Sequence, residues 1–593
     1  MSNLSKIRRD KMIEFLETLK EQHSDDESLI AINQIEKELV SKRYGLVWEE
    51  HEEAVDVMMR DNIPVFTEVK EREICMAPDE DYNFLLEGDN LHSLHLLEKT
   101  HRGKVDVIYI DPPYNTKNKD FIYDDAYVDK TDAYRNSKWL SFMQKRLIIA
   151  HKLLKKTGVI FISIDDYEYS ALKILCDEIF GSENFVATFV WKITGHTDNQ
   201  DIIIKNHEYI VCYSYAKTEL VINNIVDPNI LENSKIMRDF AENSITKNGY
   251  KNPPSFITLP AGFPCEVETL KRSKFETFPE FYDEVERTKF ISREITKKYS
   301  AVYPIPVDDM VVEDYKLKEL CRVYSGWMNN GKLKRFIENE FNPIDDNGTS
   351  VRFYLSKNGV LYYRRENRVS RYIQTVLENM GTTETNKYLL EGMGLTFDYP
   401  KPLELISYLI NIFAPSDGII IDFFAGSGTT AHAILEQSKV RNRKYKFILC
   451  TNNENNICEE ITYQRIKTVI TGKRQDGSEY SEGIPANLKY YHTDFVSKSE
   501  EYLEDSLLNH VTEMVQLEHG VRIDDDSYIM IMSDDEADEL EKKWNEYTDI
   551  KAIYVSQDVL LTASQEALFG SVDTYIIPDY YFNFELREAG ELW

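Results

Sequence analysis

The sequence predicts an α/β fold in which two halves of one sheet are separated by an inserted domain. From about residue 84 to 216, short apolar runs alternate with segments of helical periodicity, a pattern typical of parallel strands joined by helices. This alternation stops between about 217 and 390, where Asn, Pro, Tyr and basic residues become frequent, and it resumes near residue 403. The 593 residues are too many for a single core, so we expect about three or four units.

The N-terminal arm and the first half of the sheet come first along the chain. We expect residues 1–70 to be helical, because Lys6–Leu19 and Leu29–Lys42 carry apolar residues at three- and four-residue spacing. Residues 71–216 are assigned to the first half of the sheet. Its candidate strands are Val105–Ile110, Val159–Ile164 and His207–Tyr213, and its candidate helices are His92–Glu98, Trp139–Lys155 and Tyr167–Phe180. Helices between the strands imply parallel pairing.

The remaining segments complete the predicted organisation. Residues 217–390 are assigned to an irregular recognition domain. Residues 391–488 supply the second half of the sheet, with a helix at Leu403–Phe413, a strand at Ile419–Phe424, a helix near Thr430–Gln437 and a strand at Tyr445–Cys450. Residues 489–593 contain candidate strands at Tyr528–Met532, Ala552–Val555 and Thr574–Ile577, so we expect a small separate α/β domain there.

The formal net charge of −32 is unevenly distributed. Residues 490–593 hold 25 acidic and 6 basic side chains, and we expect this tail to bind protein, as a self-association or docking module, rather than DNA. Between 351 and 373 the balance is reversed, with tyrosines interleaved among the basic residues Arg352, Lys357, Arg364, Arg365, Arg368 and Arg371. Such a segment suits contact with phosphates and bases, and a solvated face is the simpler alternative.

Cysteine usage and hydropathy indicate the compartment. The seven cysteines include no C-x-x-C pair, which argues for reduced thiols and against a disulfide framework or a zinc site. We expect no bound metal. No charged and then apolar leader opens the chain, and no apolar run approaches the length that spans a bilayer. The expectation is a soluble, cytoplasmic protein.

The tetrapeptide Asp111-Pro112-Pro113-Tyr114 follows the apolar run 105–110 and is the first candidate site. Proline has no N–H and a fixed φ, so a turn of this composition leaves carbonyl oxygens without competing backbone donors. These acceptors could hold an exocyclic amine, and Tyr114 could lie against the face of the same ring. An ordinary turn at the end of a strand is the alternative.

The second candidate site is the Gly-rich segment Asp422–Thr430, where a predicted strand turns into a helix. Gly426 and Gly428 would let the backbone approach a ligand and direct helix N–H groups at it. The segment is not a Walker A loop, because no Gly-Lys-Ser/Thr follows, and it lacks the third glycine of the dinucleotide fingerprint. ATP hydrolysis and dehydrogenase activity are therefore disfavoured.

Taken together, the two motifs resemble those of S-adenosylmethionine-dependent amino-methyltransferases that act on DNA. In that family the Gly-rich turn holds the cofactor and the DPPY turn holds a flipped base, which implies a Rossmann-like methyltransferase sheet. The DPPY motif precedes the Gly-rich turn with the irregular domain between them, as in the circularly permuted β class. Asp rather than Ser at position 111 implies adenine N6 rather than cytosine N4 as the acceptor.

The resemblance assigns further residues to cofactor binding. Asp89 lies in a Gly-Asp-Asn segment similar to the one that faces the cofactor's adenine end, and Lys401 precedes Pro402 in a segment similar to the one that closes over the methionine portion. Glu454 is the candidate that holds the ribose, with Asn452 and Asn453 as alternatives. The turn itself contributes Asp422, Phe424, Gly426, Ser427, Gly428 and Thr429.

Three stretches look specifically like the modification (Mod) subunit of Type III restriction-modification systems, namely Asp422–Ala433, Thr451–Asn456 and Tyr44–Glu50. The resemblance runs from about residue 8 to 475 and is weakest over 217–350. It implies double-stranded DNA as substrate, a homodimer, and a separate helicase-endonuclease (Res) subunit as partner. It also implies base flipping, with the N6 hydrogens accepted by Asp111 and the Pro112 carbonyl while Tyr114 stacks on the adenine.

Several alternatives stay open at this point. A solitary or phage-defence methyltransferase would have the same motifs without a restriction partner, and a DNA-recognition protein could keep an inactive fold. Asp165-Asp166 could be a metal pair, and His207-Glu208-Tyr209 could border the base site or face the core. Asp61 with Glu68-Val69-Lys70 faintly resembles a nuclease pattern.

Overall fold

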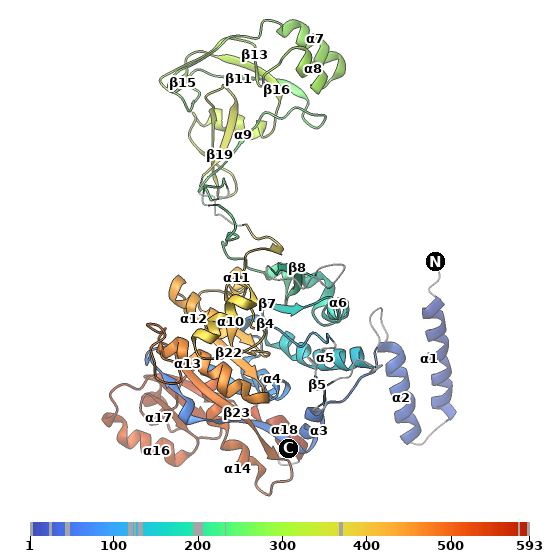
Figure 1. Ribbon diagram of the computed structural model, residues 1–593, viewed down its shortest axis with the longest axis vertical. Helices are drawn as coiled ribbons and strands as arrows, with labels where there is room; N and C mark the ends of the chain where they lie inside the picture. Colours follow the sequence, from blue (N-terminus) through green and yellow to red (C-terminus); the bar gives the residue numbers. More distant parts are fainter. Residues whose placement is uncertain are drawn as a thin grey trace. The chain divides into compact units, whose positions relative to one another are not determined.

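The computed structural model describes residues 4–22, 26–41, 48–116, 122–123, 126–127, 134–193, 205–231, 233–235, 237–366, 372–578 and 581–589. The chain forms two compact units, one of Met1–Asn223 with Gln374–Trp593 and one of Asn224–Ile373 (Figure 1). The second unit lies within the segment 217–390 that the sequence assigns to an insertion. Within the described residues, no helix is both long and apolar enough to cross a membrane.

The first unit is built on an 11-stranded mixed sheet, which confirms the predicted α/β class. Its centre is parallel because β23, β3, β22, β21, β4 and β7 all run in one direction. Every residue of β4 is buried, as expected for a strand covered on both faces. In sheet order the strands are β1 (Asn62–Glu68), β23 (Asn487–Ser497), β3 (Tyr82–Glu87), β22 (Lys446–Thr451), β21 (Ile419–Asp422), β4 (Val105–Ile110), β7 (Leu154–Ile164), β9 (His207–Ser214), β8 (Phe185–Lys192) and β20 (Val376–Leu377), with β2 (Ile74–Cys75) beside β23.

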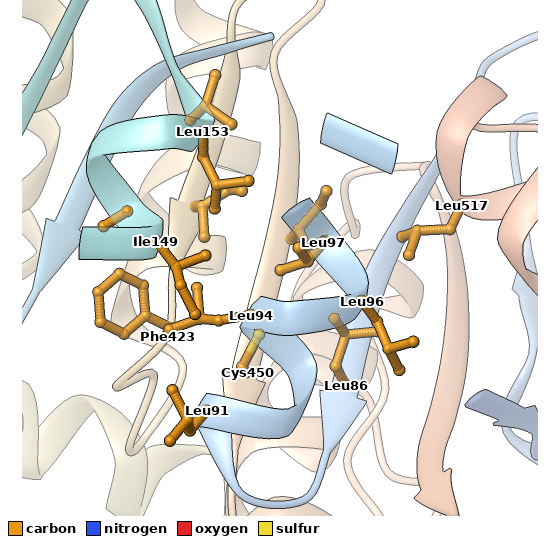
Figure 2. Packing of buried hydrophobic residues seen from close by; sticks show 14 of the residues in the cluster. Leu86, Leu91, Leu94, Leu96, Leu97, Ile149, Leu153, Phe423, Cys450 and Leu517 are labelled. Carbon is orange, nitrogen blue, oxygen red and sulfur yellow. The ribbon is translucent and has the colours of Figure 1, made fainter. Parts of the chain in front are cut away.

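Helices cover both faces of this sheet. Ile160 and Ile162 of β7 join a buried cluster with leucines of α4, while Phe161 points the other way and contacts Phe413 of α11 at 5.7 Å between ring centroids. Figure 2 shows the α4 side, where Leu94 lies near Phe423 and Cys450 and Leu96 lies near Leu86. The helices are α4 (Asn90–His101), α5 (Arg135–Leu153), α6 (Tyr169–Cys176), α10 (Thr383–Gly392), α11 (Leu403–Phe413), α12 (Thr429–Arg441) and α13 (Tyr463–Thr471).

The direction of the outer strands differs from the prediction. β9 was expected to be parallel but pairs antiparallel with β7, and β8 pairs antiparallel with β9. The strand that follows α6 is β8, and β9 lies between β8 and β7 and pairs antiparallel with both of them. As a result, the start of β9 lies at the edge where the parallel strands end.

Two predicted domain boundaries fall inside the main sheet. Residues 62–68 form β1 and pair with β23, so the helical N-terminal part consists of α1 (Leu4–Gln22), α2 (Asp26–Ser41) and α3 (Ala54–Asp61). At the other end, the boundary at 489 cuts β23, which pairs with β3 over residues 487–492. Sequence periodicity missed both strands because their partners are distant in the chain.

The acidic tail is therefore less separate than predicted. After α14 (Leu503–Leu508) and α15 (Val511–His519) it forms a parallel sheet of β24 (Tyr528–Ile531), β25 (Ala552–Ser556) and β26 (Asp573–Ile577), with α16 (Asp534–Lys543), α17 (Ala563–Phe569) and α18 (Asn583–Ala589). Ile553 and Val555 face a small core of their own, whereas Ala552 and Tyr554 join the main core. One face of the small sheet thus packs on the body of the first unit.

The second unit contains short antiparallel sheets around its own cores. They are β10 (Ala241–Ser244) with β19 (Leu361–Arg365), β18 (Ser350–Leu355) and β17 (Ile344–Asp345); β11 (Pro254–Leu259) with β16 (Cys321–Gly326) and β13 (Ile305–Pro306); and β12 (Leu270–Arg272) with β14 (Met310–Glu313) and β15 (Lys316–Leu317). Its helices are α7 (Phe278–Thr288), α8 (Arg293–Lys298) and α9 (Asn330–Glu338).

Candidate active site

The two motif turns lie side by side at the carboxyl edge of the sheet. β4 ends at Ile110 and β21 ends at Asp422, and these strands are parallel neighbours in the centre of the sheet. From β4 the chain continues to β7 on one side, and from β21 it continues to β22 on the other. The turns therefore flank the point where the strand order reverses, which is where open α/β sheets bind their ligands.

Buried side chains hold the DPPY turn in place from behind. Trp139 Nε1 donates to the Pro113 carbonyl at 2.7 Å, and Arg135 donates to the Asn115 carbonyl at 2.6 Å. Asn115 has a left-handed backbone, with φ of 60°, and its amide donates to Glu168 Oε1 at 2.7 Å. Burial raises the pKa of Glu168 to about 7. The position of the turn is thus fixed by groups that contact the backbone rather than by its own four residues.

The DPPY side chains take part in a compact charged cluster. Lys401 Nζ lies 2.8 Å from Asp111 Oδ2 and 3.3 Å from Glu208 Oε2. The Tyr114 hydroxyl oxygen lies 2.8 Å from Asp111 Oδ1 and 3.0 Å from Glu208 Oε2, so its single proton is shared between two acceptors. Two carboxylates, one ammonium group and one phenol therefore meet at the end of β4, and the formal charge of the cluster is negative.

Burial and charge fix the protonation states of two of these groups. Burial raises the pKa of Tyr114 well above its ordinary value, and the carboxylate of Asp111 adds to the effect. Burial alone would lower the pKa of Lys401, but the carboxylates of Asp111 and Glu208 outweigh it and raise that pKa. At neutral pH the phenol is therefore protonated and the ammonium group is charged.

Glu208 and Lys401 sit differently from what the sequence suggested. Because β9 is antiparallel, its second residue, Glu208, lies at the same edge as Asp111, and the expected parallel strand would have placed it at the opposite edge. Of the two readings left open for the His207-Glu208-Tyr209 segment, the structure therefore favours the one beside the DPPY turn. Lys401, which the resemblance assigned to the cofactor, contacts the DPPY acid in this structure.

The Gly-rich turn is organised by the carboxylate of Asp422. Its Oδ1 accepts the Phe424 N–H at 2.9 Å and its Oδ2 accepts the Thr430 hydroxyl at 2.5 Å. Burial raises the pKa of Asp422 to about 7. Gly426 and Gly428 have φ of 50° and 74°, and a Cβ at Gly426 would meet no atom closer than 3.8 Å. The turn therefore adopts a glycine-dependent conformation that leaves room for a further atom beside Gly426.

The side chains of Ser427 and Thr429 point toward α13. Both are buried, and both accept hydrogen bonds from Arg465 of α13, at 3.1 Å from the Ser427 hydroxyl and 2.8 Å from the Thr429 hydroxyl. What these two residues can present to a ligand is their backbone. Sequence reasoning missed Arg465, because no motif includes it and only the packing of α13 against α12 brings it behind the turn.

The other predicted cofactor residues have separate local roles. Asp89 caps α4 by accepting the Leu91 N–H at 2.7 Å and lies 3.3 Å from the guanidinium of the buried Arg146. The side chain of the neighbouring Asn90 donates to the Phe423 carbonyl at 2.7 Å and so links this segment to the Gly-rich turn. Glu454 is exposed in the turn after β22, whereas Asn453 accepts two backbone N–H groups and is occupied as a cap.

The predicted DNA-contacting residues belong to the second unit, where neighbouring acids pair with them. Arg352 and Arg364 face each other across β18 and β19 and share the Glu366 carboxylate at 2.8 and 3.1 Å. Arg365 lies 3.2 Å from Asp346. Lys357 is exposed in the turn between the strands. Arg368 and Arg371 lie outside the described residues.

The remaining alternatives find little support. Among the described residues no group of three or more His, Cys, Asp or Glu side chains could hold a metal ion. Asp166 forms an ion pair with Lys205 at 3.3 Å, and Asp165 accepts the Tyr167 N–H. Glu68 pairs with the buried Lys489 at 2.5 Å, a structural contact between β1 and β23 rather than a nuclease arrangement.

Comparison with known proteins places this geometry in a family. The chain is 29% identical over 462 residues to the Type III restriction-modification enzyme StyLTI Mod subunit of Salmonella typhimurium, covering 72% of this chain and 62% of that protein, which is less than two thirds of its length. It is 30% identical to the Type II methyltransferase M.KpnI of Klebsiella pneumoniae, covering 62% of this chain and 79% of that protein. Among solved structures, M1.HpyAVI in complex with SAM aligns at 11% identity and a TM-score of 0.27, over 65% of this chain and 98% of that one.

The sequence profile described as DNA methylase, of the N6/N4 methyltransferases, matches residues 105–463. That range covers more than half of the chain and includes both the DPPY turn and the Gly-rich turn. The chain therefore belongs to the N6/N4 DNA methylase family, whose methyl donor is S-adenosylmethionine.

Proposed function

We propose that the chain is a site-specific DNA methyltransferase that transfers a methyl group from S-adenosylmethionine to adenine N6 in duplex DNA. The observation that carries this proposal is the adjacency of the two turns, because it sets an acceptor carboxylate, Asp111, beside a glycine turn that leaves room for a ligand atom at Gly426. The family includes both N6 and N4 chemistry. The acid at position 111, in place of serine, favours adenine.

The residues around the Gly-rich turn fit the cofactor. Next to Gly426 the Phe397 ring offers apolar contact and the Phe424 carbonyl offers a hydrogen-bond acceptor, and the start of α12 directs backbone N–H groups toward the same place. Asp89, at the start of α4, offers a partly exposed carboxylate to a polar group such as a hydroxyl. When bound there, the cofactor supplies a sulfonium methyl group that a nitrogen lone pair can attack.

Three DPPY residues contact the adenine in this proposal. Asp111 and the Pro112 carbonyl accept the two N6 hydrogens, which fixes the direction of the nitrogen lone pair. The Tyr114 ring stacks on the flipped adenine, and stacking of this kind is worth about 1–3 kcal/mol per base. The negative cluster also favours the positive charge that develops on N6. Tyr114 and Lys401 each contact one oxygen of Asp111 in the structure, so N6 must either use a remaining lone pair of this carboxylate or displace one of them.

The similarity to a Mod subunit supports a finer proposal. We infer that the protein is the modification and recognition subunit of a Type III system, acting as a homodimer with a Res helicase-endonuclease partner. Residues 224–373 would select the target sequence, with Arg352, Lys357, Arg364 and Arg365 on phosphates once their acids exchange partners. The alternatives are a solitary methyltransferase and an inactive recognition protein. A purified Res subunit that fails to bind this protein would favour the solitary methyltransferase.

A methyl-transfer assay tests the proposal. Unmethylated genomic DNA is incubated with S-[methyl-³H]adenosylmethionine and the enzyme, and the digested nucleosides are separated to identify N6-methyladenine or N4-methylcytosine. Asp111→Ala should lower the rate at least about a hundredfold while cofactor and duplex binding persist. Asp165→Ala, at the end of neighbouring β7, is the matched control and should stay close to wild type. Full methylation by Asp111→Ala, or methylcytosine as the product, would refute the assignment.

A further inference from the structure

Arg465 is a fully buried guanidinium behind the Gly-rich turn. Among the ion pairs of the described residues, none includes Arg465, although its side chain is 0% exposed. It donates instead to neutral acceptors, the Ser427 carbonyl at 3.2 Å and the hydroxyls of Ser427 and Thr429. Arg146 is equally buried but is paired with both oxygens of Glu53 at 3.0 Å.

Burying the charge of Arg465 without an ion pair costs free energy. Removing an ion from water costs several kcal/mol unless an opposite charge lies close to it. Burial lowers the pKa of Arg465 to about 9, so the guanidinium is still charged at neutral pH. The nearest acid in the network, Glu436, contacts His432 at 3.4 Å, and it is His432 that touches Arg465. The positive charge behind the turn is therefore incompletely compensated.

A purely mechanical role would not require that charge. Hydrogen bonds to one carbonyl and two hydroxyls could also be made by neutral donors, although a charged donor makes them stronger. The contacts do bring the charge within one residue of Gly426, where a Cβ would meet no atom closer than 3.8 Å, and of Gly428, which packs against Thr462. The N-terminus of α12 lies at the same place and adds partial charge of the same sign.

We propose that Arg465 is a positioning residue that makes the turn 426–429 selective for the carboxylate end of the cofactor. The inference rests on the proposed function, because it assumes that the cofactor binds at this turn. A positive charge there favours the cofactor's carboxylate and disfavours its ammonium and sulfonium groups. Arg465 thereby sets which end of the methionine portion lies at the Gly-rich turn, and so directs the sulfonium methyl toward Asp111.

Calorimetry with two ligands tests this role without measuring activity. S-adenosylhomocysteine carries the carboxylate, whereas 5′-methylthioadenosine lacks both the carboxylate and the amine. Arg465→Met should weaken S-adenosylhomocysteine at least about tenfold and 5′-methylthioadenosine less than about threefold. Arg465→Lys, which keeps the charge, should preserve the preference between the ligands. Equal weakening of both ligands, or no weakening, would overturn the proposal.

A second variant separates the effect of the Arg465 charge from the effect of its hydrogen bonds to the turn. Thr429→Val removes one hydrogen bond of Arg465 but leaves its charge, so it should leave the ratio of the two affinities unchanged. If Arg465→Met does not fold, Arg465→Lys and Thr429→Val still decide the question, since loss of the preference in either of them contradicts the proposal. Wild-type protein that binds neither ligand would refute the proposed function itself, which distinguishes the two failures.

Discussion

Replacing Lys401 with methionine should destabilise the first unit by about 3 kcal/mol. The substitution keeps the length of the side chain but removes the only ammonium group that the described residues place against Asp111 and Glu208. At 2.8 and 3.3 Å and an effective dielectric constant of about 20, each contact is worth about 5–6 kcal/mol before desolvation. Desolvation of the ions opposes this gain. Breaking a buried pair by removing one partner typically costs about 3–5 kcal/mol.

The lower end of that range applies here because water reaches the cluster. The side chains of Lys401, Asp111 and Glu208 are 13%, 25% and 20% exposed, respectively. For a unit of this size, about 1 kcal/mol corresponds to roughly 1 °C in Tm, so the expected decrease is about 3 °C by differential scanning fluorimetry. The matched control is Lys387→Met, whose contact with Asp398 is 3.6 Å long and 39% and 77% exposed. It should change Tm by less than about 1 °C.

A double-mutant cycle checks the physical cause. Without Lys401 the two carboxylates repel each other, so adding Glu208→Gln to Lys401→Met should restore part of the lost stability, whereas Glu208→Gln alone should destabilise. We expect a coupling of at least about 1 kcal/mol. A Tm of Lys401→Met equal to that of the Lys387→Met control, or strictly additive effects in the cycle, would show that the cluster is not held together by charge.

Two further predictions follow from buried groups and from the course of β23. The raised pKa of Asp422, about 7, means that the folded state binds this proton more tightly than the unfolded state does, so the contribution of Asp422 to stability falls as pH rises from about 4 to 7. Asp422→Asn removes this loss, and its Tm relative to wild type should therefore increase between pH 5 and 8; a constant difference would contradict the assignment. Deleting residues 490–593 removes most of β23 and the buried Tyr490 and Tyr491, so this truncated protein should be insoluble or molten, and a cooperative wild-type Tm would refute that expectation.

The sequence predicted the elements that carry strong local signals. Val105–Ile110 and Leu403–Phe413 have the predicted bounds because a continuous apolar run and a dense apolar periodicity are each specified by adjacent residues. Sequence periodicity missed β1, β3 and β23. The pairing of β3 with β23 joins residues more than 350 positions apart in the chain. Partner strands that distant leave no trace in local periodicity, and this is also why both outer domain boundaries were misplaced.

The contrast between local sequence signals and contacts between distant segments also explains which site residues the sequence predicted. Asp111, Gly426 and Gly428 lie in turns whose composition is unusual on its own, since prolines and glycines each impose a backbone conformation. Glu168 and Arg465 are ordinary charged residues whose importance depends on packing, and Glu208, for which the sequence left two readings open, depends on strand direction. Glu208 reaches Asp111 because β9 runs antiparallel, and Arg465 reaches the Gly-rich turn because α13 packs on α12.

Glu208 also explains how Asp111 can accept a substrate amine. Asp111 contacts Tyr114 and Lys401 in the structure, and Glu208 lies within 3.3 Å of both of those partners. When an amine takes their place on Asp111, the phenol and the ammonium group can keep Glu208 as their acceptor. Neither group is then left buried without a partner, which would cost about 1–3 kcal/mol for the phenol and more for the ammonium group. The second carboxylate therefore lowers the free-energy cost of opening Asp111 to its substrate.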